Sequence, residues 1–193
     1  MALNFTVIYG SVRGERQGIR AARFMIRQIE ARGHHVTLID PAEYELPFID
    51  KMYKEYPKGE APFDLEKIAE VFRGSDAFVV VTGEYNHSMP PALTNLMDYF
   101  MNEYFWRPSG IVSYSTGSFG GVRAASHLRD MLPEIGLMTI PSTLPVPKIR
   151  AAFDEDGKAL DPAYERRALR FLNELEWFAN ALGEARKTGV PYE

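Results

Sequence analysis

Three short segments of the chain place glycine, hydroxyl and charged residues directly after apolar stretches, a combination that suits the binding of a phosphorylated ligand. In the first segment, Ser11 offers a hydroxyl donor and Arg13 offers a planar guanidinium that can bind two phosphate oxygens together. Backbone N–H groups at the start of a following helix add donors where the helix dipole favours an anion. We expect the backbone N–H groups of Gln17, Gly18 and Ile19 to be these donors.

The spacing within this first segment, Gly10 to Ile19, limits the kind of phosphate site that it can form. It is not the Gly-x-Gly-x-x-Gly motif of dinucleotide-binding proteins, and no Gly-Lys-Ser/Thr follows as in a P-loop. Taken alone, the segment also fits an ordinary strand-to-helix turn with a solvated arginine. Two further side chains, those of Arg16 and Gln17, either contact the phosphate or face water.

The second segment, Glu84 to Ser88, follows a valine-rich stretch and ends shortly before two prolines. Tyr85 can form the wall of a site for a flat ring, and Asn86 can both donate and accept hydrogen bonds. The backbone N–H groups of Glu84 to Asn86 offer equivalent donors. Glu84 also fits a helix-capping or surface carboxylate, and His87 fits a solvated loop histidine, so both interpretations stay open.

The third segment, Ser115 to Gly121, is rich in glycine and serine, which lets the backbone approach a flat ring closely. Its alternative is a flexible turn without a ligand. Arg123 follows two residues later and fits the face of a helix. The expected ligand contacts of this segment are Ser115, Thr116, Gly117 and Gly120.

These segments lie between regular elements that the hydrophobic pattern predicts. Apolar runs that stop at turn residues predict five strands, at Phe5–Tyr9, His35–Ile39, Ala77–Thr82, Gly110–Ser115 and Leu137–Ile140. Amphipathic spacing predicts five helices, at Gly18–Arg32, Asp64–Arg73, Ala92–Tyr104, Gly120–Leu132 and Pro162–Lys187. Asp64 is expected to cap the helix that it begins.

Strands that alternate with helices predict an α/β fold in which five parallel strands lie between two helical layers. This rhythm fits the flavodoxin-like three-layer sandwich with strand order 2-1-3-4-5. The three segments then follow strands one, three and four, whose carboxyl ends share the edge of the sheet where such folds bind ligands. Because no repeat or interdomain linker is visible, residues 1–193 are expected to form a single domain.

Two long connections interrupt this alternation. The stretch from Ala42 to Phe63 contains prolines and aromatic residues, and we expect it to pack against the protein as an irregular connection. The stretch from Pro141 to Asp161 is predicted to be a proline-rich loop with a turn at Asp154 to Gly157.

The composition excludes several classes of function. The chain has no cysteine, so disulfides, iron–sulfur clusters and a thiol nucleophile are excluded, and redox chemistry would require a bound cofactor. A net charge of −4 without a lysine/arginine stripe argues against nucleic-acid binding. Scattered histidines argue against a metal site, and the lack of a Gly-x-Ser-x-Gly motif argues against a serine hydrolase.

No segment of the sequence suggests a membrane or secretory destination. No apolar stretch reaches the roughly 18 residues that a membrane helix needs. The N-terminus lacks the basic region and long apolar run of a signal peptide. The expectation is therefore a cytoplasmic protein without membrane contact.

Taken together, the three segments resemble those of the NADPH-dependent FMN reductases. The blocks that carry the resemblance are Gly10-Ser11-x-Arg13, Glu84-Tyr85-Asn86-His87-Ser88-x-Pro90, and Gly120-Gly121-x-Arg123-Ala124 with Leu128-Arg129. They keep the order and approximate spacing of that family over nearly the whole chain. One departure is Gly83, where many members carry proline, and this favours a more flexible turn here.

The resemblance implies an FMN-dependent NAD(P)H oxidoreductase with NADPH as co-substrate. Hydride is expected at N5 of the flavin, and electrons pass on to a flavin, quinone, azo dye or metal oxyanion, without an obligatory catalytic side chain. The resemblance places the FMN phosphate on the first segment and the ring on the other two. The FMN-binding residues are then Ser11, Arg13, Gln17, Gly18, Ile19, Glu84, Tyr85, Asn86, Ser115, Thr116, Gly117 and Gly120.

Two other interpretations stay open. One is a flavodoxin-like electron carrier that binds FMN without oxidising a nicotinamide nucleotide, and the other is a flavin-free interaction module on the same fold. Two features argue against the carrier: the arginine in the first segment and the mild acidity of the chain. Electron carriers of that kind usually lack such an arginine and are more acidic.

Association into a homodimer or homotetramer is also expected. On the helix predicted at Ala92–Tyr104 and just beyond it, Tyr99, Phe105 and Trp106 lie off the stripe that faces the core. Exposed aromatic residues of this kind are enriched where subunits meet. The alternative is that the connection from Ala42 to Phe63 covers them within one subunit.

Overall fold

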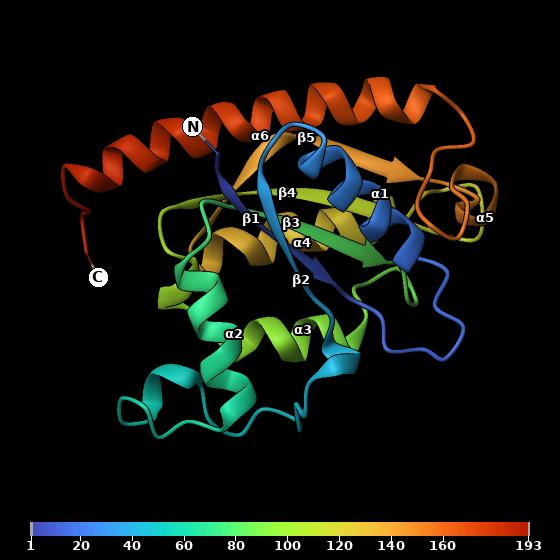
Figure 1. The fold of residues 1–193 in the computed structure, drawn as a ribbon. Coiled ribbons are helices and arrows are strands. Elements are labelled where there is room, and N and C mark those ends of the chain that lie inside the picture. The colour runs from blue at the N-terminus through green and yellow to red at the C-terminus, as the bar shows by residue number, and fades with distance from the viewer. Residues whose placement is uncertain (1, 193) are drawn as a thin grey trace.

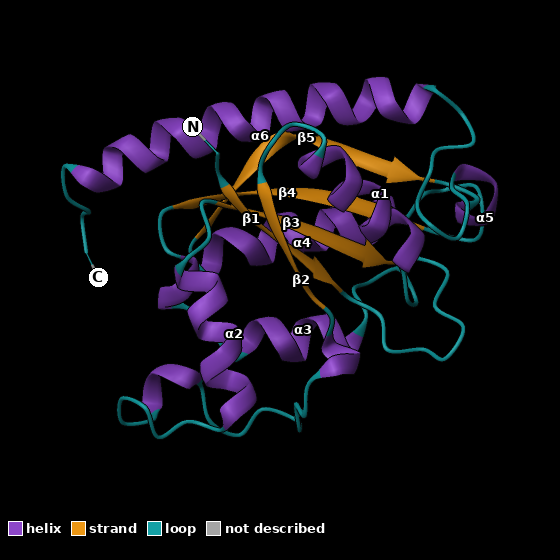
Figure 2. Cartoon of the chain, in the orientation of Figure 1, coloured by secondary structure: helices purple, strands orange, loops and turns teal. Residues whose placement is uncertain are grey.

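Five parallel strands form the centre of the protein, with helices on both faces of the sheet (Figures 1 and 2). The structure is a computed structural model that describes residues 2–192. The strands lie in the order β2-β1-β3-β4-β5, and every pairing is parallel, which confirms the predicted flavodoxin-like architecture. Their bounds are β1 (Asn4–Tyr9), β2 (His35–Ile39), β3 (Ala77–Gly83), β4 (Arg107–Tyr114) and β5 (Leu137–Val146).

The helices are divided between the two faces of the sheet (Figure 1). α1 and α6 share one buried cluster with the sheet, whereas α2, α3 and α4 enclose a second cluster on the opposite face. The short α5 follows β5 at the edge where the strands finish. The bounds are α1 (Ile19–Glu30), α2 (Phe63–Arg73), α3 (Pro91–Asp98), α4 (Val122–Glu134), α5 (Ile149–Ala152) and α6 (Ala163–Lys187).

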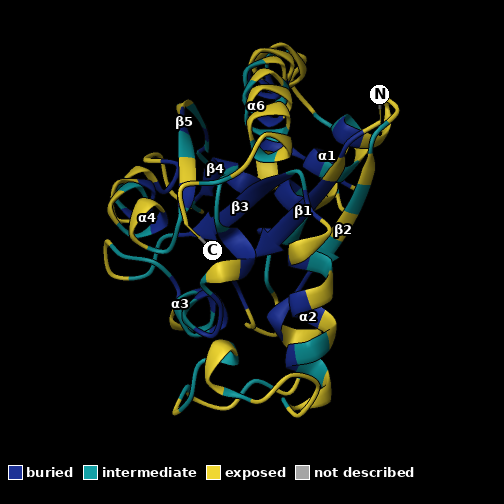
Figure 3. Cartoon of the chain, turned by 90° about the vertical axis from the view of Figure 1, so that its left-hand side faces the viewer, coloured by how far each residue is buried: buried dark blue, intermediate teal, exposed yellow. Residues whose placement is uncertain are grey.

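The central strand β3 explains why this sequence needs both helical layers. All seven of its residues are buried, and successive side chains point to opposite faces. Val79 and Val81 join the cluster under α1 and α6, and Phe78 and Val80 join the cluster under α2 to α4. Figure 3 shows the result, with buried residues along the strands and exposed residues on the outer faces of the helices.

The last strand, β5, is longer than predicted. It continues from Ile140 through Pro141 and Pro145 to Val146. Proline is tolerated because β5 is an edge strand, where one side of the backbone has no partner strand. The prediction of a loop from Pro141 onward was therefore wrong for six residues. The register of β5 against β4 shifts between Ser109 and Ile111. The predicted turn from Asp154 is present, since Gly157 donates to the carbonyl of Asp154 at 3.2 Å.

The third predicted helix is also wrong at its end. α3 stops at Asp98, and a separate 3-10 turn, η3, covers Asn102–Tyr104. The long connection packs against this break: the Tyr53 N–H donates to the carbonyl of Tyr99 at 2.8 Å, and the Tyr99 hydroxyl donates to the carbonyl of Pro47 at 2.8 Å. The connection, which includes the turns η1 (Pro41–Glu43) and η2 (Tyr53–Glu55), is therefore packed as predicted.

Of the three aromatic residues that suggested a subunit contact, Tyr99 is buried, and Phe105 and Trp106 are half-buried within this chain. Tyr99 is only 2% exposed beneath the connection. The rings of Phe105 and Trp106 lie 5.6 Å and 4.7 Å from the ring of Tyr192, and the Trp106 indole N–H donates to the Tyr192 carbonyl at 3.0 Å. These residues therefore give no support to an oligomer.

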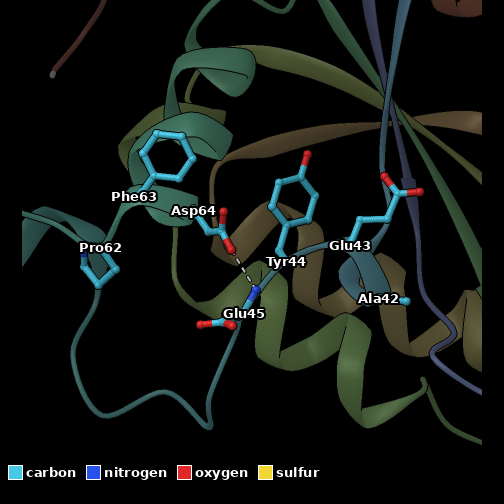
Figure 4. A pocket seen from close by; sticks show the side chains of 7 residues that line it. All are labelled: Ala42, Glu43, Tyr44, Glu45, Pro62, Phe63 and Asp64. Atoms are coloured by element: carbon cyan, nitrogen blue, oxygen red, sulfur yellow. Dashed lines mark hydrogen bonds between the residues drawn. The ribbon is translucent and has the colours of Figure 1, made fainter.

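Asp64 does not cap α2 as predicted. Pro62 occupies the N-cap position, and the Asp64 carboxylate accepts a hydrogen bond of 2.7 Å from the Glu45 N–H (Figure 4). This bond ties the connection to the first turn of α2 and leaves an open groove beside Tyr44 and Phe63 (Figure 4). None of the residues predicted to bind FMN lines this groove.

Residues 2–192 contain neither a membrane-spanning helix nor a cluster of metal ligands. No helix in that range has both the length and the apolar character that crossing a membrane requires. No three histidine or carboxylate side chains in the same range come together as metal ligands would.

Candidate functional site

A cleft of about 470 Å³ opens at the carboxyl edge of the sheet. Its walls come from the ends of β3 and β4, from the loops after β1, β3 and β4, and from the start of α5. The size lies in the usual range for small-molecule sites. The cleft is lined by Ser11, Arg13, Gly14, Glu15, Arg16, Gln17, Gly83, Glu84, Tyr85, Tyr114, Ser115, Thr116, Ile149 and Arg150.

The cleft brings together residues from all three predicted segments. Seven of the predicted contacts line it: Ser11, Arg13, Gln17, Glu84, Tyr85, Ser115 and Thr116. Five others lie nearby in the same loops but outside its walls: Gly18, Ile19, Asn86, Gly117 and Gly120. Their contacts with a cofactor stay predictions.

The first loop is held in place by its own charges. Arg16 forms an ion pair with Asp40, a buried carboxylate at the end of β2, and also donates to the Ser11 carbonyl at 3.2 Å. Arg16 therefore anchors the loop. This role differs from the two that the sequence suggested, which were contact with the phosphate and exposure to water. By contrast, Arg13 is exposed, and no acceptor within residues 2–192 binds its guanidinium, which leaves it free for a ligand.

The backbone donors at the start of α1 are only partly available. The Ile19 N–H donates to the Arg16 carbonyl at 3.3 Å, so this predicted donor is already used. The N–H groups of Gln17 and Gly18 bind no acceptor in the part of the chain that the structure describes. The side-chain oxygen of Gln17 is buried and equally unpartnered among these residues. Buried polar atoms without partners are uncommon, and a donor on a ligand in the cleft would satisfy this one.

In the second loop, the carboxylate of Glu84 caps α4. It accepts from the backbone N–H of Arg123 and from the Arg123 guanidinium, each at 3.1 Å. The guanidinium also lies over the ring of Phe119, with 4.5 Å between them. The interpretation of Glu84 as a helix-capping residue is thus confirmed. Its carboxylate is engaged by Arg123, and the other atoms of Glu84 are left to line the cleft.

The tip of the second loop, Asn86 to Ser88, forms a tight turn outside the walls of the cleft. Tyr85 and Ser88 exchange two backbone hydrogen bonds of 2.9 Å, which close a tight turn. The two residues between them, Asn86 and His87, have positive φ angles of 50° and 66° and exposed side chains. Asn86 tolerates this conformation better than most residues, which gives asparagine a structural reason to occupy the turn. Its contact with the cofactor stays a prediction.

The third loop depends on hydrogen bonds within itself. The Ser115 hydroxyl donates to the Gly117 carbonyl at 3.0 Å and accepts from the Gly120 N–H at 2.9 Å. Gly121 has a φ of 74°, and a Cβ there would lie 2.7 Å from the Tyr114 carbonyl oxygen. The glycines thus close the turn against β4, and Thr116 remains exposed at the cleft.

A cluster of hydroxyl groups below the cleft was missed by the sequence analysis. Tyr114 is 8% exposed and donates to the Tyr9 hydroxyl at 3.3 Å, and the nearly buried Ser11 hydroxyl bonds to the Tyr85 hydroxyl at 2.9 Å. Burial raises the pKa of Tyr114 far above its ordinary value and also raises the pKa of Tyr9. Both phenols therefore stay neutral and act as hydrogen-bonding groups. The available signal was a tyrosine at the end of both β1 and β4.

The chain is similar to known flavin-dependent reductases in both sequence and fold. Residues 3–151 match the family model described as NADPH-dependent FMN reductase. A protein named NAD(P)H-dependent FMN reductase from Schizosaccharomyces pombe is 29% identical, over 94% of this chain and 84% of that protein. A 2-hydroxy-1,4-benzoquinone reductase from Burkholderia sp is 28% identical, over 73% and 77% of the two chains.

The solved structures include similar folds. FerB from Paracoccus denitrificans, described as a flavoenzyme NAD(P)H:(acceptor) oxidoreductase, superimposes with a TM-score of 0.70 and 20% sequence identity. The match covers 95% of this chain and 98% of that chain. At this level of identity the comparison shows a shared fold.

Substitution of Gly18 tests whether the first loop must lie against Tyr114. A Cβ at position 18 would lie 1.9 Å from the ring of Tyr114, so Gly18→Ala must displace the loop or the ring. Overpacking of this kind destabilises proteins by about 1–3 kcal/mol, and we expect a loss of FMN affinity as well. Denaturant unfolding and flavin-fluorescence titration measure the two effects.

The matched control is Gly74→Ala at the end of α2, outside the cleft, because a Cβ at Gly74 would meet its nearest neighbours at the ordinary contact distances of 3.5 and 3.6 Å. That variant is expected to resemble the wild type in both measurements. Wild-type stability and FMN affinity in Gly18→Ala would contradict the role given to Tyr114.

Proposed function

The chain belongs to the NADPH-dependent FMN reductase family, and on that premise we propose that FMN binds in the cleft with its phosphate on the first loop. The chain is an oxidoreductase that uses FMN with NAD(P)H as co-substrate. The observation that supports the placement is the set of free donors beside α1, namely Arg13 and the N–H groups of Gln17 and Gly18. These groups suit a phosphate dianion at a helix N-terminus.

The other groups in the cleft suit the rest of the cofactor. The unpartnered oxygen of Gln17 can accept from a ribityl hydroxyl, and Tyr85 with Thr116 borders the space left for the ring. FMN supplies the redox chemistry when bound, since it accepts hydride at N5 and releases electrons to an acceptor. The side chains bind and orient, and we assign no side chain as an acid or base because His87 is exposed outside the cleft.

The proposed reaction is hydride transfer from NADPH to the cofactor, followed by electron transfer to a small acceptor. The name of the Burkholderia relative supports a quinone as that acceptor. Flavins, azo dyes and metal oxyanions are further proposed acceptors. The need for NADPH and the absence of cysteine support a cytoplasmic location.

Anaerobic reduction tests this function directly. Purified protein loaded with FMN should lose its flavin absorbance when NADPH is added under nitrogen, with NADH tested in parallel. Admission of a quinone should restore the oxidised spectrum. If neither nucleotide reduces the flavin, although dithionite does, the protein is an electron carrier rather than a reductase. Failure to bind FMN at all would favour an interaction module.

Arg13→Ala tests the position of the phosphate. Removal of a hydrogen bond to a charged group costs about 1.5–3 kcal/mol, so FMN affinity should fall roughly tenfold to a hundredfold. Flavin-fluorescence titration of the apoprotein measures it. Arg27→Ala, an exposed position on α1 within the helix, changes net charge equally and should leave the affinity unaltered. Equal affinity in Arg13→Ala and the wild type would exclude this phosphate site.

We also propose that the chain forms a homodimer or homotetramer. The aromatic residues near α3 do not support this, but a separate groove of about 400 Å³ does. It is largely apolar, combines Val12 of the first loop with Phe48 of the long connection and reaches Pro91 at the start of α3. Phe48 is 86% exposed, which is unusual for a large apolar side chain unless another surface covers it.

Light scattering distinguishes these states. The wild type should have at least twice the 21.9 kDa mass of the chain, and Phe48→Asp should reduce it to one chain mass. Phe63→Asp is the matched control, because Phe63 is 79% exposed in the other groove (Figure 4) and its replacement should not change the mass. A wild type with one chain mass, flavin and activity would disprove the oligomer.

A further inference from the structure

The segment after β5 brings one arginine to the cleft that the assigned FMN contacts do not use. Arg150 lies in α5, is exposed and lines the cleft together with its neighbour Ile149. Within residues 2–192 its guanidinium forms no ion pair and no hydrogen bond, unlike those of Arg16 and Arg123. Arg150 was not among the residues that the sequence pattern singled out.

The backbone holds this segment firmly beside the third loop. The Ser115 N–H donates to the Val146 carbonyl at 3.1 Å, and the Ile149 N–H donates to the Ser115 carbonyl at 3.1 Å. A third bond of 2.9 Å runs from the Lys148 N–H to the Gly117 carbonyl. Because Ser115 belongs to the segment expected to contact the ring, these bonds hold the backbone that carries Arg150 on the ring side of the cleft.

Lys148 makes the turn that leads to Arg150. Its φ and ψ angles of 47° and 54° are left-handed, which is uncommon for a residue other than glycine, asparagine or aspartate. Residues held in such conformations concentrate at binding sites and active sites. The side chain of Lys148 is exposed, so a second cation lies two residues from Arg150.

The charges of the cleft leave an excess of cations at its mouth. Five charged residues line it: Arg13, Glu15, Arg16, Glu84 and Arg150. Of these, Arg16 is neutralised by Asp40, and Glu84 is neutralised by Arg123. Two cations without a carboxylate partner among residues 2–192, Arg13 and Arg150, therefore face one such carboxylate, Glu15, within the walls of the cleft. Arg13 is assigned to the FMN phosphate, and Lys148 adds an exposed cation outside these walls, two residues before Arg150. A protein with a net charge of −4 thus presents positive groups at this point.

We propose that Arg150, assisted by Lys148, binds a phosphate group of the nicotinamide nucleotide. The inference rests on the proposed function, because that function requires the nicotinamide to lie against the flavin ring. Its phosphates must then pass the rim of the cleft, where a free guanidinium can bind two oxygens of one phosphate. Arg150 does not contact the reacting atoms, so it is a positioning residue that sets nucleotide affinity.

The test compares Arg150→Gln with the wild type, both loaded with FMN. Calorimetric titration with NADP⁺ and with NAD⁺ measures binding without turnover. We expect affinity for NADP⁺ to fall at least tenfold, the low end for loss of a charge-assisted contact. The limiting rate of flavin reduction at saturating NADPH should change little. The FMN affinity of the variant should equal that of the wild type.

Arg170→Gln provides the matched control. Arg170 is an exposed arginine of α6 outside the cleft, so its replacement changes net charge without removing the proposed contact. Added salt should weaken NADP⁺ binding to the wild type and to this control more steeply than to Arg150→Gln. Loss of affinity for both nucleotides would assign Arg150 to the pyrophosphate, and loss for NADP⁺ alone would assign it to the 2′-phosphate. Either outcome supports the proposal.

Three results would overturn it. The first is unchanged nucleotide affinity in Arg150→Gln. The second is weaker FMN binding, which would place Arg150 at the FMN phosphate with Arg13. The third is a raised KM for a sulfonated quinone, but not for a neutral one, with nucleotide binding unaltered, which would assign Arg150 to an anionic acceptor. Failure of NADPH to reduce the wild-type flavin is a separate result, because it rejects the proposed function whatever the variant does.

Discussion

The position of one buried ring governs the geometry of the candidate site. Tyr114, at the end of β4, lies between the first and second loops. Its ring would clash with a Cβ at Gly18, at 1.9 Å, and would lie tightly against a Cβ at Gly83, at 3.0 Å. Both loops therefore approach the sheet as far as this ring permits. Its hydroxyl continues to Tyr9 at the end of β1, so the two strands that flank β3 are joined directly below the cleft. A change in the ring would move two walls of the site together.

Two ion pairs complete this arrangement by fixing the loops from outside. Arg16 binds the buried Asp40, and loss of either partner would leave a charge in a poorly solvated place, which is strongly unfavourable. Glu84 and Arg123 join the second loop to the first turn of α4. The charges of Arg16 and Glu84 are thus neutralised within the protein, whereas Arg13 and Arg150 stay available to bind ligands. The same cleft thereby combines a rigid frame with free cations, which suits a cofactor and a co-substrate that both carry phosphate.

The sequence predicted the fold well where the controlling interactions are local. The valine-rich run of β3, the amphipathic spacing of α1 and α6, and glycine at turns are properties of neighbouring residues, and they located the strands and their order. The predictions were wrong where contacts between residues far apart in the sequence determine the secondary structure. β5 runs through two prolines because it lies at an edge, and the helix from Pro91 ends at Asp98, where the long connection packs against it.

For the site, the sequence alone determined that three loops would meet, because parallel strands place their carboxyl ends at one edge of the sheet. It also identified Ser11 and Arg13, whose chemistry suits phosphate in any orientation. Only the tertiary structure decided which side chains face the cleft. It showed that the Glu84 carboxylate caps α4, that Asn86 lies outside the walls of the cleft, and that Tyr114 and Arg150 line it. The physical reason is that these outcomes depend on partners far along the chain: Glu84 finds Arg123, and Ile149 finds Ser115, at separations that no local pattern records.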